Sequence, residues 1–283
     1  MVELAPAGQG LLRQGFAGDT FNTAWYLKRL CPQWQVDYLS AVGRDAISDA
    51  MLGFMAGAGI GTEHVVRRAE RTVGLYLISL DRGERSFSYW RGQSAARTLA
   101  DEPEALRRGL AGAGLVVISG ITLAILAPDR RKVLLEALRV SGAVIAFDPN
   151  MRPRLWPDRA EMLAAVAEAA GVADIVLPSF DEEAALVGDA TPEATLARYR
   201  AMGPDVVVVK NGGGRIHACD AAGEVRFDPT PIKPVDTTAA GDSFNAGFLA
   251  ARFGGAGLVA SVAAGSALAG RVIGHPGALV AEV

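Results

Sequence analysis

The sequence predicts an α/β fold with a mostly parallel central sheet and helices on both of its faces. Two observations support this. Four short, continuous, β-branched runs are typical of strands that are buried on both faces, and stretches with helical apolar spacing lie between them, as in 130–140 and 159–171. The regular succession of strand and helix indicates βαβ units, whose strands share one ligand crevice at their carboxyl ends. The four runs are 115–118, 143–147, 174–177 and 206–209.

Composition limits the classes of function. With 283 residues, of which 50% are hydrophobic, the chain is long enough for one large α/β domain spanning 1–283. A net charge of -3 argues against a nucleic-acid partner. Cys31 and Cys219 show no metal-ligand spacing, and the first residues lack the pattern of a signal peptide, so a cytoplasmic protein is expected. The uncharged stretch 253–270 is mostly small residues, which predicts packed helices and not a membrane span.

One segment interrupts the alternation of strands and helices. Residues 72–91 alternate in polarity on either side of Asp81-Arg82-Gly83, which is a hairpin turn signal. A hairpin inserted in an α/β domain is a candidate lid, and we expect lid elements at about 8–17 and 64–92. Strand alternation places Phe87, Tyr89 and Arg91 on the same face.

The stretch 234–248 is the most informative for chemistry. Small residues at 237–241 precede Asp242, after which apolar residues begin a helix. The free amides of a helix N-terminus favour a phosphate. A carboxylate at the same place would repel a phosphate, but it would be useful as the base that accepts a proton from an attacking hydroxyl. The alternative is that Asp242 only caps the helix.

The pattern Asp-Thr-x-small-small-Gly-Asp in this stretch resembles the C-terminal signature of ribokinase-like (PfkB-type) carbohydrate kinases. The resemblance implies a ribokinase-like fold, with Asp242 as general base and Ala239, Ala240 and Gly241 as the anion hole. It also places Asp236 and Thr237 beside the nucleotide phosphates. The segment 18–22 is similar to the family's N-terminal signature, which implies that the sugar is bound by Gly18, Asp19 and Asn22.

The same resemblance implies ATP and Mg²⁺ as cofactors. Lys210 and Gly212, which follow the 206–209 strand, are expected to lie against ATP, with His275 in a loop nearby. Ser179 and Glu182 occupy the place of the family's Asn-x-x-Glu motif. Ser179 replaces the Asn of that motif, and Glu182 is the expected Mg²⁺-positioning residue, although Glu183 could compete with it for the role.

Two arginines suggest which sugar is bound. Arg91 ends the hairpin and Arg152 follows the 143–147 strand. Arginine forms forked bonds to carboxylates, so the pair predicts a sugar acid; ordinary ion pairs within the lid are the alternative. The pattern 76–91 together with Asp148-Pro-Asn-x-Arg resembles the branch of the family that phosphorylates 2-keto-3-deoxygluconate. It implies transfer to the terminal hydroxyl of 2-dehydro-3-deoxy-D-gluconate, giving the 6-phosphate, with substrate contacts from Tyr76, Tyr89, Arg91 and Arg152.

Two other functions remain open from the sequence. One is a kinase for a neutral sugar, such as a fructokinase, and the other is a sugar-acid sensor without turnover. An oxidoreductase that uses a dinucleotide is excluded by the lack of a Gly-x-Gly-x-x-Gly turn after an early strand. Lid strands in this family often pair between subunits, so a homo-oligomer formed through the lid is a further expectation.

The beginning of the chain departs from the family pattern. Family members have a strand of the type Ile-x-x-Ile-Gly-Glu before Met-x-Glu-Leu, whereas this sequence starts at Met1-Val2-Glu3-Leu4. That strand lies in the middle of the sheet in the family. We therefore expect unpaired backbone groups and open apolar surface at its place. The sequence leaves open whether translation starts upstream of Met1, or the protein is unstable or has adapted.

Overall fold

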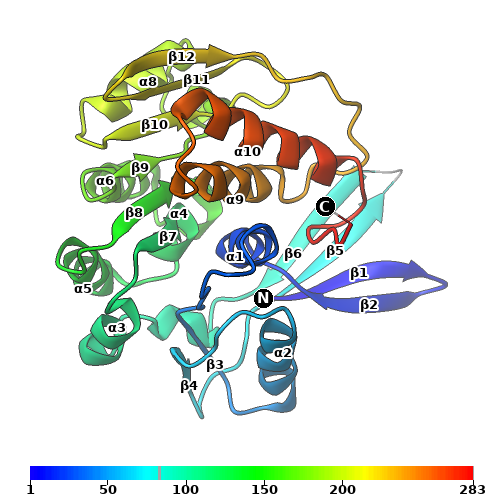
Figure 1. Ribbon diagram of the computed structural model, residues 1–283. Coiled ribbons are helices and arrows are strands. Elements are labelled where there is room, and N and C mark those ends of the chain that lie inside the picture. The colour runs from blue at the N-terminus through cyan, green and yellow to red at the C-terminus, as the bar shows by residue number, and fades with distance from the viewer. Residues whose placement is uncertain (82–83, 283) are drawn as a thin grey trace.

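A six-stranded sheet forms the centre of the protein (Figure 1). The structure is a computed structural model, and it describes residues 1–81 and 84–282. The strand order is β12-β11-β10-β9-β8-β7, in which β7 to β10 run parallel and β11 and β12 are antiparallel. The four predicted strands are confirmed as β7 to β10. The strands are β7 (Leu115–Ser119), β8 (Val144–Asp148), β9 (Ile175–Val176), β10 (Val206–Val209), β11 (Ile216–Asp220) and β12 (Gly223–Phe227).

Helices cover both faces of this sheet, as predicted (Figure 1). On one face lie α3 (Pro103–Leu110), α5 (Pro128–Arg139), α6 (Arg159–Ala170) and α8 (Pro192–Arg200), with the short α4 (Gly120–Ala124) and α7 (Phe180–Leu186) at strand ends. On the other face lie α1 (Asp19–Leu30), α9 (Ala240–Phe253) and α10 (Leu258–Ile273). Two short 3-10 turns, η1 (Ala95–Thr98) and η2 (Pro153–Leu155), complete the connections.

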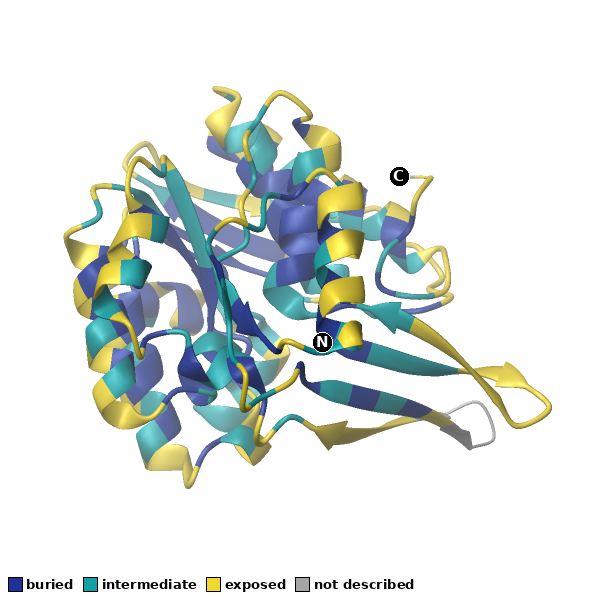
Figure 2. Ribbon diagram, turned by 90° about the horizontal axis from the view of Figure 1, so that it is seen from below, coloured by how far each residue is buried: buried dark blue, intermediate teal, exposed yellow. Residues whose placement is uncertain are grey.

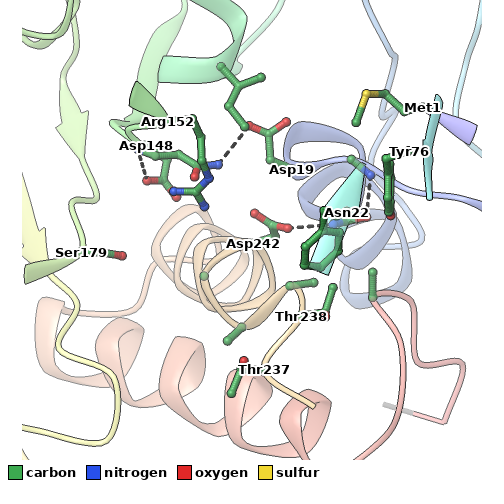
Figure 3. Close-up of a pocket in the computed structure, with 18 of the residues that line it drawn as sticks. Met1, Asp19, Asn22, Tyr76, Asp148, Arg152, Ser179, Thr237, Thr238 and Asp242 are labelled. Atoms are coloured by element: carbon green, nitrogen blue, oxygen red, sulfur yellow. Dashed lines mark hydrogen bonds between the residues drawn. The ribbon is translucent and has the colours of Figure 1, made fainter. Parts of the chain in front are cut away.

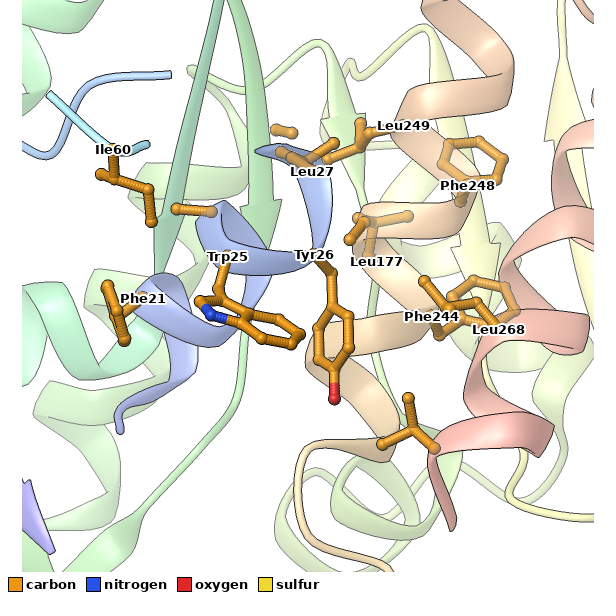
Figure 4. Close-up of a cluster of buried hydrophobic side chains, with 14 of the residues drawn as sticks. Phe21, Trp25, Tyr26, Leu27, Ile60, Leu177, Phe244, Phe248, Leu249 and Leu268 are labelled. Carbon is orange, nitrogen blue, oxygen red and sulfur yellow. The ribbon is translucent and has the colours of Figure 1, made fainter. Parts of the chain in front are cut away.

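The valines of β10 show why this strand is apolar throughout. Val206 and Val208 belong to the core on the α1, α9 and α10 side, whereas Val207 and Val209 belong to the core on the α5 and α6 side. Because side chains alternate between the two faces, a strand with a helix layer on each side needs apolar residues at every position. Figure 4 shows the first core, where aromatic side chains of α1 pack towards α9.

The C-terminal helices pack closely because both carry glycine at the crossing. A Cβ on Gly247 would lie 2.9 Å from the Ala264 carbonyl, and one on Gly265 would lie 2.8 Å from the Phe244 carbonyl. The apolar stretch 253–270 is therefore part of a helix pair, as expected. Among the described residues, no helix has the length and apolarity required to span a membrane.

A second sheet, of four strands, projects from the main body, and the tip of its first hairpin, at residues 8–11, is exposed (Figure 2). Its order is β2-β1-β5-β6, and β5 and β6 form the predicted hairpin, whose turn residues Arg82 and Gly83 lie outside the described residues. Lid elements were expected at about 8–17 and 64–92. In the structure, the first hairpin of this sheet starts at Val2, and residues 65–67 belong to another sheet. The strands are β1 (Val2–Gly8), β2 (Leu11–Phe16), β5 (Leu75–Asp81) and β6 (Glu84–Trp90).

The remaining strands, β3 (Ser40–Val42) and β4 (Val65–Arg67), pair only with each other, beside α2 (Ala46–Gly57). They are not joined to the six-stranded sheet. A cavity of about 560 Å³ borders β7, and the β7 edge at 115–118 lines it together with Tyr38 and Leu39, which precede β3, and His64, which precedes β4. Within the described chain, that edge of β7 pairs with no other strand. The β7 edge of the six-stranded sheet is therefore open among the described residues.

Candidate active site

A pocket of about 300 Å³ lies at the carboxyl ends of β8 and β10, where α1 and α9 begin (Figure 3). We call it the site pocket. It is at the sheet edge where parallel α/β folds bind ligands. The predicted site residues that line it are Gly18, Asp19, Asn22, Tyr76, Tyr89, Arg91, Arg152, Ser179, Glu182, Lys210, Thr237, Ala239, Ala240, Gly241 and Asp242. Three predicted nucleotide residues, Gly212, Asp236 and His275, are not part of its lining.

Asp242 is in the first turn of α9. The helix starts after Ala239, whose φ of 61° is left-handed and turns the chain sharply into the helix. The side-chain amide of Asn22 in α1 donates a hydrogen bond of 2.7 Å to Oδ2 of Asp242, and the Thr23 hydroxyl donates one of 3.2 Å to its carbonyl. Helix α1 therefore fixes both the backbone and the carboxylate of Asp242, and Figure 3 shows this carboxylate directed into the pocket.

The environment of Asp242 makes it a weaker acid than an ordinary aspartic acid. Burial of the carboxyl and the nearby charge of Asp19 raise its pKa to about 7, and Asp148 acts in the same direction. The hydrogen bond from Asn22 and the positive charge of Lys210 oppose the shift. A carboxylate with a pKa close to neutral is well suited to accept a proton from a hydroxyl.

The backbone amides before Asp242 are not all available to an anion. The amide of Ala240 donates to the Thr237 carbonyl at 3.2 Å, closing the turn. The amides of Ala239 and Gly241 donate to no acceptor in the part of the chain that the structure describes. As the structure stands, the predicted anion hole therefore has two available donors, at Ala239 and Gly241, and the Ala240 amide serves the turn itself.

The predicted sugar signature of α1 is tied to the ends of β7 and β8. Asp19 accepts hydrogen bonds from the Ser119 hydroxyl and, at 3.2 Å, from the Asn150 side-chain amide. The Gly18 amide donates to Oδ1 of Asn22 at 3.2 Å, which orients the Asn22 side chain so that its amide faces Asp242. Polar groups from three elements thus meet on one wall of the site pocket.

The second sheet supplies an aromatic wall. Tyr76, Phe87 and Tyr89 lie with ring centroids 6.1 to 6.3 Å apart, and the guanidinium of Arg91 lies 4.3 Å from the centre of the Tyr89 ring. Burial lowers the pKa of Arg91, and the charge of Arg152 adds to this effect. The Tyr76 hydroxyl donates to Glu3, so it is already engaged within the sheet.

Arg152 has a protein partner at the pocket. It forms an ion pair with Glu182, and the Met151 amide donates to the same carboxylate at 2.9 Å. The sequence assigned Arg152 to the sugar acid and Glu182 to Mg²⁺, but it did not indicate that the two would contact each other. In the structure, the proposed acid-binding group and the proposed metal-positioning group form one unit.

Glu182 and Glu183 differ in burial and in their position relative to the site pocket. Glu183 is fully buried, where it accepts a hydrogen bond of 2.8 Å from the Tyr199 hydroxyl and pairs with Arg198. It points into the core away from the site pocket, whereas Glu182 lines the pocket. Glu183 is therefore a structural residue.

The nucleotide residues predicted from the sequence do not all lie free at the site pocket. Ser179 and Thr237 line the site pocket, but the Lys210 ammonium is 2.8 Å from Asp148 and buried. Gly212 has a left-handed φ of 52°, as expected of a glycine turn, outside the pocket lining. His275 is bonded through Nδ1 to the Arg271 carbonyl at 2.9 Å. Their contacts with ATP stay predictions.

The carboxylates of the site fit a magnesium ion that is shared with a nucleotide. Mg²⁺ keeps several waters and usually takes only one or two protein carboxylates together with phosphate oxygens. Glu182 and Asp148 are the acidic groups at the pocket wall near Ser179. Among the described residues, no group of three or more His, Cys, Asp or Glu side chains forms a metal cluster.

Sequence reasoning did not assign Asp148 and Asn150 to the site, although their motif was noted. Asp148 ends β8 and binds Lys210, whereas Asn150, with a left-handed φ of 31°, reaches Asp19. The signal was present, since polar residues directly after a buried parallel strand lie at the ligand edge of the sheet. Met1 also lines the pocket, and burial lowers the pKa of its amino group to about 6.

Comparison with known proteins agrees with this geometry. The chain belongs to the pfkB family of carbohydrate kinases, whose family model matches residues 7–282. It is similar to the 2-dehydro-3-deoxygluconokinase of Haemophilus influenzae, with 39% identity over 295 residues that cover 100% of this chain and 94% of the relative. The 2-dehydro-3-deoxygluconokinase of Escherichia coli K12 is 37% identical over 99% of this chain and 94% of its own length.

Solved structures show the same fold. A PfkB protein from Polaromonas sp. JS666 superposes with a TM-score of 0.87 and 30% identity, covering 97% of this chain and 93% of that one. The fructokinase from Xylella fastidiosa, solved with bound ATP, superposes with a TM-score of 0.84 at 23% identity over 98% of this chain and 91% of its own. The ribokinase-like fold expected from the two signatures is confirmed.

Proposed function

We propose that this kinase transfers the γ-phosphoryl group of ATP to the terminal hydroxyl of 2-dehydro-3-deoxy-D-gluconate, giving the 6-phosphate. The observation that carries the proposal is the position of Asp242, which stands in a pocket with two arginines and has a pKa of about 7. Relatives that share 37–39% identity with this chain bear the name of this activity.

The base is assigned to Asp242. It accepts the proton of the sugar hydroxyl as that oxygen attacks phosphorus, while Asn22 holds its carboxylate in position at 2.7 Å. The free amides of Ala239 and Gly241, at the positive end of the α9 dipole, stabilise the negative charge of the phosphoryl group in flight. Mg²⁺ neutralises the phosphate charges when it is bound. Glu182 and Asp148 are the residues suited to position it.

We expect the carboxylate of the sugar acid to bind at the side of the pocket formed by the β5–β6 hairpin. Arg91 stacks on Tyr89 and has no carboxylate partner among the ion pairs of the described chain, so its forked donors are available. Arg152 supplies a second positive charge from the β8 side, although Glu182 shares it. A partly buried cation without a protein anion favours an anionic ligand.

A neutral sugar as substrate is the second candidate, and one observation favours it. Because Arg152 is paired with Glu182, only Arg91 is left to bind a carboxylate in the structure as it stands. Fructokinases are also relatives, with 30% identity to the protein from Salmonella typhimurium over 88% of this chain.

The test is a comparison of substrates. ADP release with Mg-ATP is measured for 2-dehydro-3-deoxy-D-gluconate, fructose and ribose, and the phosphorylated carbon is located by NMR. Turnover with the keto acid and a phosphate on C6 supports the proposal. Turnover with fructose or ribose alone would establish the neutral-sugar candidate, and binding of the acid without turnover would indicate a sensor.

A further inference from the structure

Lys210 is a buried lysine at the base of the site. It directly follows β10 and is 7% exposed. Its ammonium nitrogen lies 2.8 Å from Oδ2 of Asp148 and 3.1 Å from Oδ1 of Asn245. Lysine is rarely buried to this degree unless it is paired, because removing its charge from water is costly. Here both partners are themselves buried.

The three side chains form one hydrogen-bonded set, in which each side chain contacts the other two. Besides accepting from Lys210, Asp148 Oδ2 accepts a hydrogen bond of 2.6 Å from the Asn245 side-chain amide. Asp148 ends β8, Lys210 follows β10, and Asn245 is in α9. The set therefore links two strand ends to the helix that carries Asp242. Satisfied polar networks of this kind fix one arrangement of the elements that they join.

The ammonium also lies close to the turn that carries the free amides. A Cβ on Gly241 would be 3.5 Å from Lys210 Nζ, which is the nearest side-chain atom to that position. Asn245 is four residues further along α9, one helical turn from Gly241. The charge of Lys210 is thus placed against the backbone of the anion-binding turn and anchored to the next turn of the same helix.

Charged groups from three other elements bear on Asp242. Asp19 comes from α1, Asp148 from the end of β8 and Lys210 from the end of β10. The two carboxylates disfavour ionisation of Asp242, whereas Lys210 favours it. Without a positive charge here, three carboxylates would share one wall of the site pocket.

We propose that Lys210 is a positioning residue, which anchors the first turns of α9 to the strand ends and keeps Asp242 in its ionised, proton-accepting form. This inference rests on the proposed role of Asp242 as base. It differs from the direct contact with ATP that the sequence suggested, and the two roles affect different kinetic quantities. A phosphate ligand sets the KM for Mg-ATP, whereas a positioning charge sets the pH at which Asp242 ionises.

The experiment compares Lys210→Met, Lys210→Gln, and Lys132→Met as a surface control on α5. The pH dependence of kcat/KM and the KM for Mg-ATP are measured for each, and the ionisation of Asp242 is followed by carbon-13 NMR of carboxyl-labelled protein. In Lys210→Met we expect the acid limb and the NMR midpoint to move up by about one pH unit. The KM for Mg-ATP should change less than about threefold.

Lys210→Gln removes the charge but keeps a side-chain amide that can donate to Asp148, so its acid limb and NMR midpoint should also move up, with the KM for Mg-ATP changed less than about threefold. It carries the test if Lys210→Met alone does not fold. An unmoved NMR midpoint in Lys210→Met, or a KM for Mg-ATP raised about tenfold in either variant, would overturn the proposal. If Asp242→Asn kept full turnover, the proposed function would fail instead, independently of Lys210.

Discussion

Asn22 and Asp242 are 220 residues apart in the sequence, and the side-chain amide of the first donates a hydrogen bond of 2.7 Å to the carboxylate of the second. This contact joins the N-terminal signature to the C-terminal one at the floor of the site pocket. It orients the carboxylate and also favours its ionised form, against the burial that raises its pKa. The two sequence motifs therefore meet in one hydrogen-bonded arrangement at the site pocket.

Activity should depend on pH through Asp242. The base must be ionised, and its pKa of about 7 lies above that of an ordinary aspartate, so the protonated, inactive form accumulates as the pH falls below about 7. We expect kcat/KM for the sugar to decrease tenfold per pH unit on the acid side of that value. Steady-state assays between pH 5 and 9 measure this. An acid limb near pH 4 would show that another group, or no buried base, limits the reaction.

Arg91→Gln tests the acid-binding side of the pocket. A charge-assisted hydrogen bond contributes about 1.5–3 kcal/mol, so loss of this guanidinium should raise the KM for the keto acid roughly tenfold to a hundredfold. The KM for Mg-ATP should stay within about twofold. Arg215→Gln is the matched control, because Arg215 is exposed and pairs with Asp228 away from the pocket. Equal effects of the two substitutions on the keto acid would contradict the assignment.

The adjacent glutamates should behave differently. Glu183→Ala leaves the buried Tyr199 hydroxyl without its acceptor, while Arg198 keeps its ion pair with Asp189, so the substitution should cost about 1–3 kcal/mol of folding free energy. Glu182→Gln should leave the unfolding midpoint nearly unchanged but raise the Mg²⁺ concentration needed for half-maximal rate. Thermal unfolding and Mg²⁺ titration of both variants separate the two roles. If the Mg²⁺ requirement moved in Glu183→Ala only, the assignment would be reversed.

The open edge of β7 should be visible by hydrogen exchange. Strand β8 is paired on both sides, with β7 and β9, whereas β7 borders the cavity of about 560 Å³ on its other side. We therefore expect amides at 115–118 to exchange faster than those at 145–147. Mass spectrometry of peptides covering both strands makes the comparison within one sample. Equal protection of the two strands would mean that the edge is covered in solution.

The parallel strands could be predicted because their burial on both faces leaves a simple signature. Val206 to Val209 must be apolar at each position, and no tertiary information is needed to see it. The turn before α9 could likewise be predicted from the sequence, because a run of small residues followed by an aspartate is seldom needed for packing alone. The close packing of α9 and α10 followed from their small residues, which permit the approach seen at Gly247 and Gly265.

The contacts between site residues could not be predicted in the same way. The ion pair of Arg152 with Glu182, and that of Lys210 with Asp148, join residues from separate loops and strand ends. Their pairing depends on the three-dimensional approach of those ends, for which spacing along the chain gives no signal. For the same reason, the sequence could not show that the Ala240 amide closes the turn on Thr237.

The central claim is that Asp242 is the base, and the most direct measurement is the kcat of Asp242→Asn with the keto acid at saturating Mg-ATP. Asparagine has nearly the same shape and can still accept the hydrogen bond from Asn22, but it cannot take a proton. The account predicts that kcat falls by about 10²–10⁴-fold, with calorimetric affinity for the keto acid retained within a few-fold. A kcat within tenfold of the unmodified enzyme would contradict it.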